Sequence, residues 1–567
     1  MGKAARSKSA RRDRTSLPAP TVVPSPLRKR RFPDSAPVYL AGVFLATAGL
    51  LVYLNALRGP FVFDDFPAIS NNPTIRALWP PSSVLSPPAK TPVSGRPLVN
   101  FSLALNYAIS GLNVGSYHLF NVIVHLCAGL VLFGIVRRTL ISPELRARYR
   151  THATGIALAA SLLWIVHPLA TESVNYTIQR TELLMGVFLL FTIYSSIRSF
   201  ESPDRRIWEI AALGAFALGM ASKEVAVVTP VLVLAYDRLF WSKSLRDVWK
   251  SHWRLYVGLA IVLVIFVLLI ATRFRGAFAG FTRRDVTPWQ YALTQTGVII
   301  HYLRLAFFPT ALAADYGGWP IAKSIGEVLP SLLVLVALAA LTLVGLFRQK
   351  RVAFLGVVFF LILAPTSSFR PVPAEVAAER RMYLPLAALV VLIVLVAHAA
   401  MRRLRAPRGI GIAVVAGLAL TLGVTTIRRN VDYRSTFSFW SDVVAKRPDN
   451  ARARLWLGQH FYKSGRFQEA LQQYETAVRL QPQNAVARFG LGVALGRLGR
   501  TAEAIDQYRE AVRFNPRYAR AHYNLALALS RVGQLEEVEG HLEAALRLKP
   551  DFTAARRALD ARRGTGP

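Results

Sequence analysis

Two adjacent carboxylates, Asp64 and Asp65, end the stretch Gly59-Pro60-Phe61-Val62-Phe63-Asp64-Asp65. This stretch follows directly on a hydrophobic run, residues 38–57, that is long enough to cross a bilayer. A carboxylate held beside a hydroxyl can take its proton and so act as a general base. Adjacent carboxylates cannot both ionise freely, so each raises the proton affinity of the other. The pair predicts acid/base chemistry on a substrate carried at a membrane. The competing interpretation is a pair of ordinary solvated loop acids.

Cations that could bind a phosphate lie at the ends of other hydrophobic runs. The candidates are Arg96, Arg180, Lys223, Arg380 and Arg381. A cation near hydrocarbon needs a partner, so two simpler interpretations compete: snorkelling to lipid headgroups, and local ion pairing of Arg180 with Glu182 or of Lys223 with Glu224. Arg380 follows Glu379 in a loop that turns straight into a hydrophobic run, which favours a phosphate clamp there.

Further polar residues at the same run ends are predicted to support such a site. They are His118, His167, Glu172, Glu182, Glu224, Glu379 and Tyr383. His118 shares one helical face with Asn121 and His125, which predicts a polar stripe turned into a helix bundle. No set of ligands is spaced convincingly for a metal, so we predict hydrogen-bonded roles for these histidines and leave a divalent metal requirement open.

The composition indicates a membrane protein. Hydrophobic residues make up 53% of the 567 residues, the mean hydropathy is +0.34, and only 18% of residues are charged. The net charge of +37 would by itself suggest nucleic acid as a partner. Much of the excess lies in short segments between hydrophobic runs, where it orients helices instead, so we predict no nucleic-acid binding. The single cysteine, Cys127, excludes an internal disulfide.

The hydrophobic runs predict about eleven membrane spans, with the amino terminus in the cytoplasm. After residues 38–57, they lie at 118–137, 152–167, 182–198, 207–222, 225–240, 255–272, 327–347, 352–367, 384–401 and 409–427. An odd number of spans places the carboxyl-terminal region outside the cytoplasm. Residues 288–308 are ambiguous, and we predict a re-entrant or surface helix there.

A repeat with a period of 34 residues begins after residue 440. Three residue classes share the period: Pro448, Pro482, Pro516 and Pro550; Gly465, Gly499 and Gly533; and Ala477, Ala511 and Ala545. This is the tetratricopeptide pattern, which predicts a solenoid of helix pairs. We expect three repeats, with a short basic helix at 552–563 as the cap.

The predicted organisation has three parts. Residues 1–37 form a basic disordered cytoplasmic tail, and residues 38–430 form the transmembrane domain. The first outer loop, residues 58–117, is the longest. Residues 440–563 form the repeat domain.

Taken together, these motifs resemble the transmembrane and tetratricopeptide repeat-containing O-mannosyltransferases. The resemblance rests on segments in the same order along the chain: Phe61-Val62-Phe63-Asp64-Asp65, Gly95-Arg96-Pro97-Leu98, His167-Pro168 through Glu182, Ser222-Lys223-Glu224, and Glu379-Arg380 with Tyr383-Leu384-Pro385. It implies an all-α, multispanning GT-C type helix bundle followed by the solenoid. It also implies transfer of a sugar, with mannose the best guess, from a polyprenyl or dolichyl phosphate carrier to protein Ser or Thr hydroxyls outside the cytoplasm.

The resemblance fixes the expected partners: the lipid-linked sugar as donor, an acceptor protein held by the repeats, and membrane lipids. No cofactor is firmly implied. The arginine-rich sequence favours a bacterial inner membrane, with the endoplasmic reticulum the expectation for a eukaryotic protein. Two alternatives stay open: the same donor with a lipid or surface-glycan acceptor, and a non-enzymatic membrane scaffold or flippase-like carrier that uses its repeats for assembly.

Overall fold

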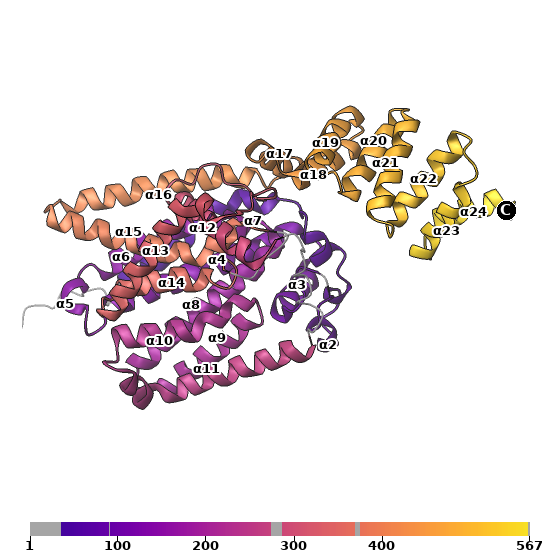
Figure 1. Cartoon of the computed structure of the whole chain (residues 1–567). Helices are drawn as coiled ribbons and strands as arrows, with labels where there is room; N and C mark the ends of the chain where they lie inside the picture. The colour runs from indigo at the N-terminus through magenta and orange to yellow at the C-terminus, as the bar shows by residue number, and fades with distance from the viewer. Residues whose placement is uncertain (1–35, 90, 274–285, 369–374, 565–567) are drawn as a thin grey trace, which may run out of the picture.

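The computed structural model describes residues 36–89, 91–273, 286–368 and 375–564. All regular secondary structure in these residues is helical, as predicted. A helix bundle extends from α1 (Ala36–Tyr53) to α16 (Arg408–Val431), and a solenoid follows from α17 (Thr436–Lys446). Figure 1 shows the solenoid projecting from the end of the bundle where α16 passes into α17. The predicted basic tail lies almost entirely outside the described residues.

Each of the eleven predicted hydrophobic runs coincides with a helix, but not every helix is long enough to span a bilayer. Among the described residues, seven segments are long and apolar enough. The count is eight if α6 (Ala153–Ile165) and the segment Pro168–Asn175, which meet at 54°, form one bent span. The remaining three, α9 (Arg205–Met220), α10 (Thr229–Phe240) and α14 (Ala353–Leu363), are shorter. The predicted number of eleven spans is therefore approximate. The seven contain α1, α4 (Val114–Leu140), α8 (Arg180–Glu201), α11 (Leu245–Arg273), α13 (Ile325–Phe347), α15 (Tyr383–Arg403) and α16.

The bundle has inner and outer helices. In α4 and α8, 61% and 67% of the most apolar window is buried by other helices, whereas in α13 and α16 only 11% is. The outer helices expose large apolar side chains such as Leu341 (72%) and Ile412 (71%). A helix whose exposed face is apolar is stable in contact with lipid, so these helices form the membrane-facing surface.

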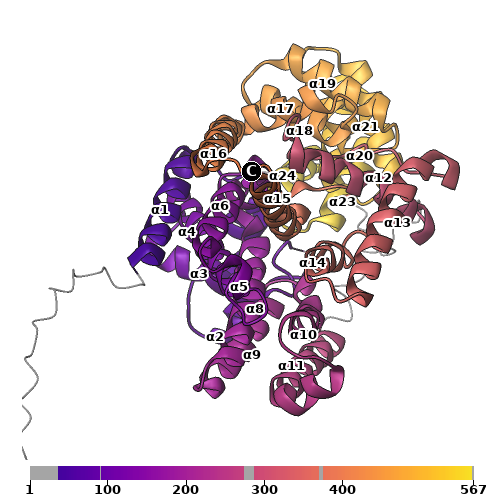
Figure 2. The ribbon, with the colours of Figure 1, turned by 90° about the vertical axis from the view of Figure 1, so that its left-hand side faces the viewer.

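The functional candidates lie in the segments that connect these helices. Residues 58–117 contain short helical turns, α2 (Pro81–Val84) and α3 (Pro97–Ser110). The ambiguous segment forms α12 (Pro288–Phe307), which begins at a capping box between Thr287 and Gln290 and lies beside α13 (Figure 2). Helix α12 is not among the seven candidate spans. The short helices α5 (Arg146–Tyr149) and α7 (Thr171–Asn175) complete the bundle.

The solenoid has the predicted period. Gly465, Gly499 and Gly533 adopt positive φ angles of 75°, 79° and 77° at the turn within each helix pair, a conformation that favours glycine. The pairs are followed by the predicted basic helix, α24 (Thr553–Arg563), which packs on α23. The repeat helices are α18 (Ala451–Lys463), α19 (Phe467–Leu480), α20 (Ala485–Arg497), α21 (Thr501–Phe514), α22 (Ala519–Arg531) and α23 (Val538–Leu548).

Candidate active site

The two adjacent aspartates have different environments. Asp65 is fully buried, and both of its oxygens accept backbone hydrogen bonds, from Val62 N–H at 2.9 Å and from Ile178 N–H at 2.8 Å. Burial raises the pKa of Asp65 to about 8, while the two backbone donors favour the ionised form. Asp65 thus ties the first outer loop to the start of α8, which is a structural task.

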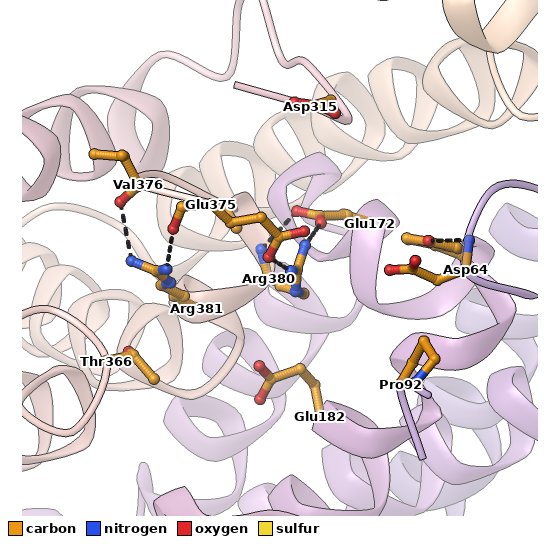
Figure 3. Close-up of polar contacts among 12 residues, drawn as sticks. Asp64, Pro92, Glu172, Glu182, Asp315, Thr366, Glu375, Val376, Arg380 and Arg381 are labelled. Carbon is orange, nitrogen blue, oxygen red and sulfur yellow. Dashed lines mark hydrogen bonds and ion pairs between the residues drawn. The ribbon is translucent and has the colours of Figure 1, made fainter. Parts of the chain in front are cut away.

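Asp64 is half-buried and points toward Arg380 (Figure 3). Its backbone N–H donates to Tyr176 Oη at 2.9 Å, which fixes its position relative to the turn after α7. Burial raises the pKa of Asp64, and the positive charge of Arg380 opposes this shift. Of the two predicted bases, Asp64 is the one whose carboxylate is not committed to holding the loop.

Arg380 lies between two acids. Its guanidinium pairs with Glu172 through Nη1 and with Glu375 through Nη2, and its backbone N–H donates to Glu172 Oε2 at 2.8 Å (Figure 3). The Arg380 side chain is 11% exposed, Glu172 1% and Glu375 25%. Arg380 therefore already binds an anion on its more open side, the carboxylate of Glu375.

Arg381 is held by neutral oxygens. It donates to the carbonyls of Glu375 and Val376, the latter at 3.0 Å, and to Tyr291 Oη at 3.3 Å. It lines a small cavity together with Arg380 and Glu182. Because no carboxylate neutralises it in these contacts, Arg381 adds positive charge to this cavity.

A second buried ion pair lies below Arg380. Lys223 Nζ pairs with Glu182, and the two side chains are 10% and 5% exposed. Arg96 lies closer to solvent and is 3.6 Å from Glu224. Sequence neighbours suggested the pairs Arg180 with Glu182 and Lys223 with Glu224. The structure pairs Glu182 with Lys223 and Glu224 with Arg96 instead, because the helices bring distant residues together.

Arg180 does not reach the proposed phosphate site. It is fully buried and donates to Asn121 Oδ1 at 3.0 Å and to the carbonyls of Ser102 and Tyr117 at 3.1 and 3.2 Å. Its guanidinium also lies 4.1 Å from the centre of the Phe120 ring. These contacts join α3, α4 and α8, so the position of Arg180 is that of an internal crosslink and not of a phosphate ligand.

Several supporting residues hold the bundle together. His118 contacts the carbonyl of Gly59 at 3.2 Å, and Tyr383 Oη contacts His125 Nδ1 at 2.9 Å, so the predicted polar stripe does face inward. His167 Nδ1 accepts from Leu169 N–H at 3.1 Å and thereby caps the start of the 3-10 turn Pro168–Ala170, which follows α6. These contacts confirm the hydrogen-bonded roles predicted for the histidines of α4.

Glu379 is also committed to structure. Its Oε1 accepts from Ala313 N–H at 2.6 Å and from Tyr316 Oη at 2.7 Å, and the residue is fully buried. It ties the Arg380 segment to the loop that follows α12. Within the described ranges, no group of three or more His, Cys, Asp or Glu residues could hold a metal ion.

An apolar groove adjoins the charged cavity. Leu384 and Ile362 line both, and the groove extends between α4, α8, α14 and α15 to Arg351 near the opposite end of the bundle. Its walls are almost entirely aliphatic and aromatic side chains. The candidate site thus has three parts: the Asp64 carboxylate, a small cavity lined by Glu182, Arg380 and Arg381, and the adjoining apolar groove.

Sequence reasoning missed two groups at this site. Glu375, which occupies the open side of Arg380, gave no signal because it lies in no motif. The aromatic residues around Phe63, described below, gave only a weak one: a bulky apolar residue directly before the acid pair.

Both parts of the chain match known families. Residues 90–270 match the family described as Dolichyl-phosphate-mannose-protein mannosyltransferase, a class of glycosyltransferases. Residues 440–485, 458–519 and 489–551 match Tetratricopeptide repeat. Both parts of the predicted resemblance are confirmed.

The relatives carry the name protein O-mannosyl-transferase. One from Caenorhabditis elegans is 25% identical over 77% of this chain and 62% of its own length. TMTC4 of Mus musculus is 25% identical over 78% and 66%, and Tmtc3 of Drosophila melanogaster is 26% identical over 82% and 57%. The chain thus spans less than two thirds of the length of these relatives.

Solved structures match a smaller share. The crystal structure of MamA is 23% identical, with a TM-score of 0.22, and covers 25% of this chain and 84% of its own. The tetratricopeptide protein YrrB is 20% identical, with a TM-score of 0.21, and covers 30% of this chain and 88% of its own.

Proposed function

We propose that this protein transfers a mannosyl group from a polyprenyl or dolichyl phosphate carrier to Ser or Thr hydroxyls of a protein, on the non-cytoplasmic side of a membrane. The observation that carries the proposal is that the Asp64 carboxylate faces Arg380, whose positive charge acts on it, at one end of the bundle. The match of residues 90–270 and the names of the relatives support mannose as the sugar and protein as the acceptor.

In this mechanism Arg380 binds the carrier phosphate. The phosphate takes the position of the Glu375 carboxylate at Nη2, and Glu172 keeps its contact with Nη1 and so orients the guanidinium. Planar arginine can bind two oxygens of one phosphate at once. As the bond between the sugar and the phosphate breaks, charge grows on the phosphate, and a preorganised cation stabilises it without reorganising. Arg381 adds charge to the same cavity.

Asp64 acts as the general base. The acceptor oxygen forms a bond to C1 of mannose while the bond from C1 to the phosphate oxygen breaks, and the hydroxyl proton passes to the Asp64 carboxylate. The products are the mannosylated acceptor, the free lipid phosphate and a protonated Asp64. Because burial raises the pKa of Asp64, it is a stronger base than an exposed aspartate.

The apolar groove accommodates the carrier chain. It leads away from Arg380 between α14 and α15 and is lined almost entirely by apolar side chains. A polyprenyl chain buried there would hold its phosphate at Leu384, beside Arg380. The solenoid, which projects from the same end of the bundle, presents the acceptor protein (Figure 1).

The test uses the full chain in liposomes with polyprenyl phosphate mannose and a Ser/Thr-containing protein. We expect Asp64→Asn to bind the donor normally and to lose about 10² to 10⁴ in transfer rate, because asparagine cannot take the proton. Glu536→Gln, which removes an exposed acid in the repeats, is the matched control and should be unchanged.

Two outcomes would contradict the proposal. Equal transfer by Asp64→Asn and wild type would remove Asp64 as the base. Absence of transfer to protein by the wild-type chain would favour a lipid or glycan acceptor if the donor is still consumed, and the scaffold or carrier interpretation if it is not.

A further inference from the structure

Phe63, the residue directly before Asp64, has an unusual backbone. Its φ angle is +42°, in the left-handed region that bulky residues rarely adopt. Such a conformation persists only where the surroundings fix it. The surroundings of Phe63 are therefore informative about how Asp64 is held.

Those surroundings come from the solenoid. The Phe63 ring meets Trp440 of α17 edge to face, with centroids 5.9 Å apart, and Trp456 of α18 in the same way at 5.8 Å. The two tryptophans stack on each other at 6.0 Å with an angle of 7° between their planes. Trp440 is 1% exposed. We call Phe63, Trp440 and Trp456 the aromatic clamp.

Polar contacts fix the same helices to the bundle. Arg452 of α18 lies over the Phe63 ring at 5.6 Å and pairs with Asp315 at 3.1 Å. Asn450 Nδ2 donates to the Asp315 carbonyl at 3.2 Å, and Lys446 Nζ donates to the Leu312 carbonyl at 2.7 Å. The first repeat is thus docked on the loop between α12 and α13 as well as on Phe63.

On its other side, the loop is held by the bundle: Tyr176 Oη accepts from the Asp64 N–H, and Asp65 Oδ1 accepts from the Ile178 N–H. The segment that contains Asp64 is therefore held by the membrane domain on one side and by α17 and α18 on the other. A displacement of either support would move its carboxylate relative to Arg380.

We propose that the aromatic clamp positions Asp64 for catalysis, so that α17 and α18 belong to the catalytic unit and the later repeats do not. Phe63, Trp440 and Trp456 are positioning residues: they act through Asp64 and touch no reacting atom. This inference rests on the proposed function. It assigns the first repeat a task beyond acceptor binding, because a misplacement of about 1 Å can cost about 10²-fold in rate.

The test compares substitutions in the full chain. Phe63→Ala and Trp456→Ala remove clamp contacts, Phe63→Tyr keeps the ring, and Phe63→Gly tolerates the backbone conformation without a ring. Phe489→Ala is the matched control, because Phe489 is a half-buried aromatic of the second repeat that packs on Tyr508 and Tyr518. Donor binding, kcat and the pH dependence of transfer are measured for each.

We expect kcat to fall about 10²-fold in Phe63→Ala, Phe63→Gly and Trp456→Ala, with donor KM unchanged, and to stay near wild type in Phe63→Tyr and Phe489→Ala. The acid limb of the rate profile should move to lower pH in Phe63→Ala, since water entering beside Asp64 relieves the burial that raises its pKa. The charged and titratable groups that act on or with Asp64 are Arg380 and Tyr176 from the bundle, Arg452 from α18, Asp315, and the adjacent Asp65. All five are retained in these variants.

Equal kcat in Phe63→Ala and Phe489→Ala would overturn the inference. If Asp64→Asn still abolishes transfer, the proposed function survives that result and only the clamp fails. If neither Phe63→Ala nor Asp64→Asn affects transfer, both the role of the aromatic clamp and the proposed function are refuted. A normal kcat in Phe63→Gly alone would show that the backbone conformation matters and the ring contacts do not.

Discussion

Charged side chains pair differently in the bundle and in the solenoid. In the solenoid, pairs such as Arg509 with Glu537 are 43% and 53% exposed. In the bundle, Lys223 with Glu182 and Arg380 with Glu172 are at most 11% exposed. Burying an ion pair costs desolvation energy that its attraction rarely repays in full, whereas an exposed pair costs and contributes little. The difference teaches that these two buried pairs of the bundle, unlike the exposed pairs of the solenoid, are the ones whose disruption should have a large effect.

The largest effect on stability should follow from removing one charge of the buried pair of Lys223 and Glu182. Glu182→Gln leaves Lys223 charged and without its carboxylate, which costs about 3 to 5 kcal/mol when a buried partner is removed. Unfolding in mixed micelles measures it. The double variant Glu182→Gln with Lys223→Met should recover most of the loss. A single variant as stable as wild type would show that this pair is hydrated and that the comparison is wrong.

A smaller loss is expected at the anion site. Since Glu172 would be left unpaired by removal of Arg380, Arg380→Lys is the cleaner change: it keeps the charge and loses the forked geometry. We expect donor turnover to fall about 10²-fold while the protein stays folded. Arg403→Lys, at the exposed far end of the same candidate span, Glu379–Arg403, is the control. Unchanged donor turnover in Arg380→Lys would move the phosphate to another cation, with Arg381 next.

The smallest effect should come from the solenoid. Arg509→Ala removes an exposed pair with Glu537 and should change stability by at most about 0.5 kcal/mol. Thermal unfolding of the full chain, read at a probe within the repeats, measures it. A loss as large as that of Glu182→Gln would erase the distinction between the two regions.

Most of the fold could be predicted because it rests on signals that are local in sequence. Hydrophobic runs locate the bundle helices, and the 34-residue period locates the repeats. The number of spans was harder to predict, because α9, α10 and α14 are apolar helices that are too short to count as spans. Hydropathy reports the composition of a segment and does not report where its helix begins and ends.

The site was predicted in part, for a physical reason. Asp64 and Arg380 could be singled out because acids and cations at the ends of apolar runs are costly and unusual. The sequence could not show that Arg180 finds carbonyl partners from α3 and α4, or that Asp65 holds a loop. Those partners are backbone groups of distant segments. Because every residue carries such groups, the sequence does not indicate which of them will bind Arg180 or Asp65.

The docking of the first repeat has a consequence for how such chains can change over time. Its contacts with Phe63 and Asp315 fix α18 in place, whereas each later helix pair packs mainly on its neighbours along the solenoid. Gain or loss of whole units beyond the first would alter the reach of the molecule while leaving the chemistry untouched. Under the proposed function, the number of later units could therefore vary while Asp64 keeps its position relative to Arg380.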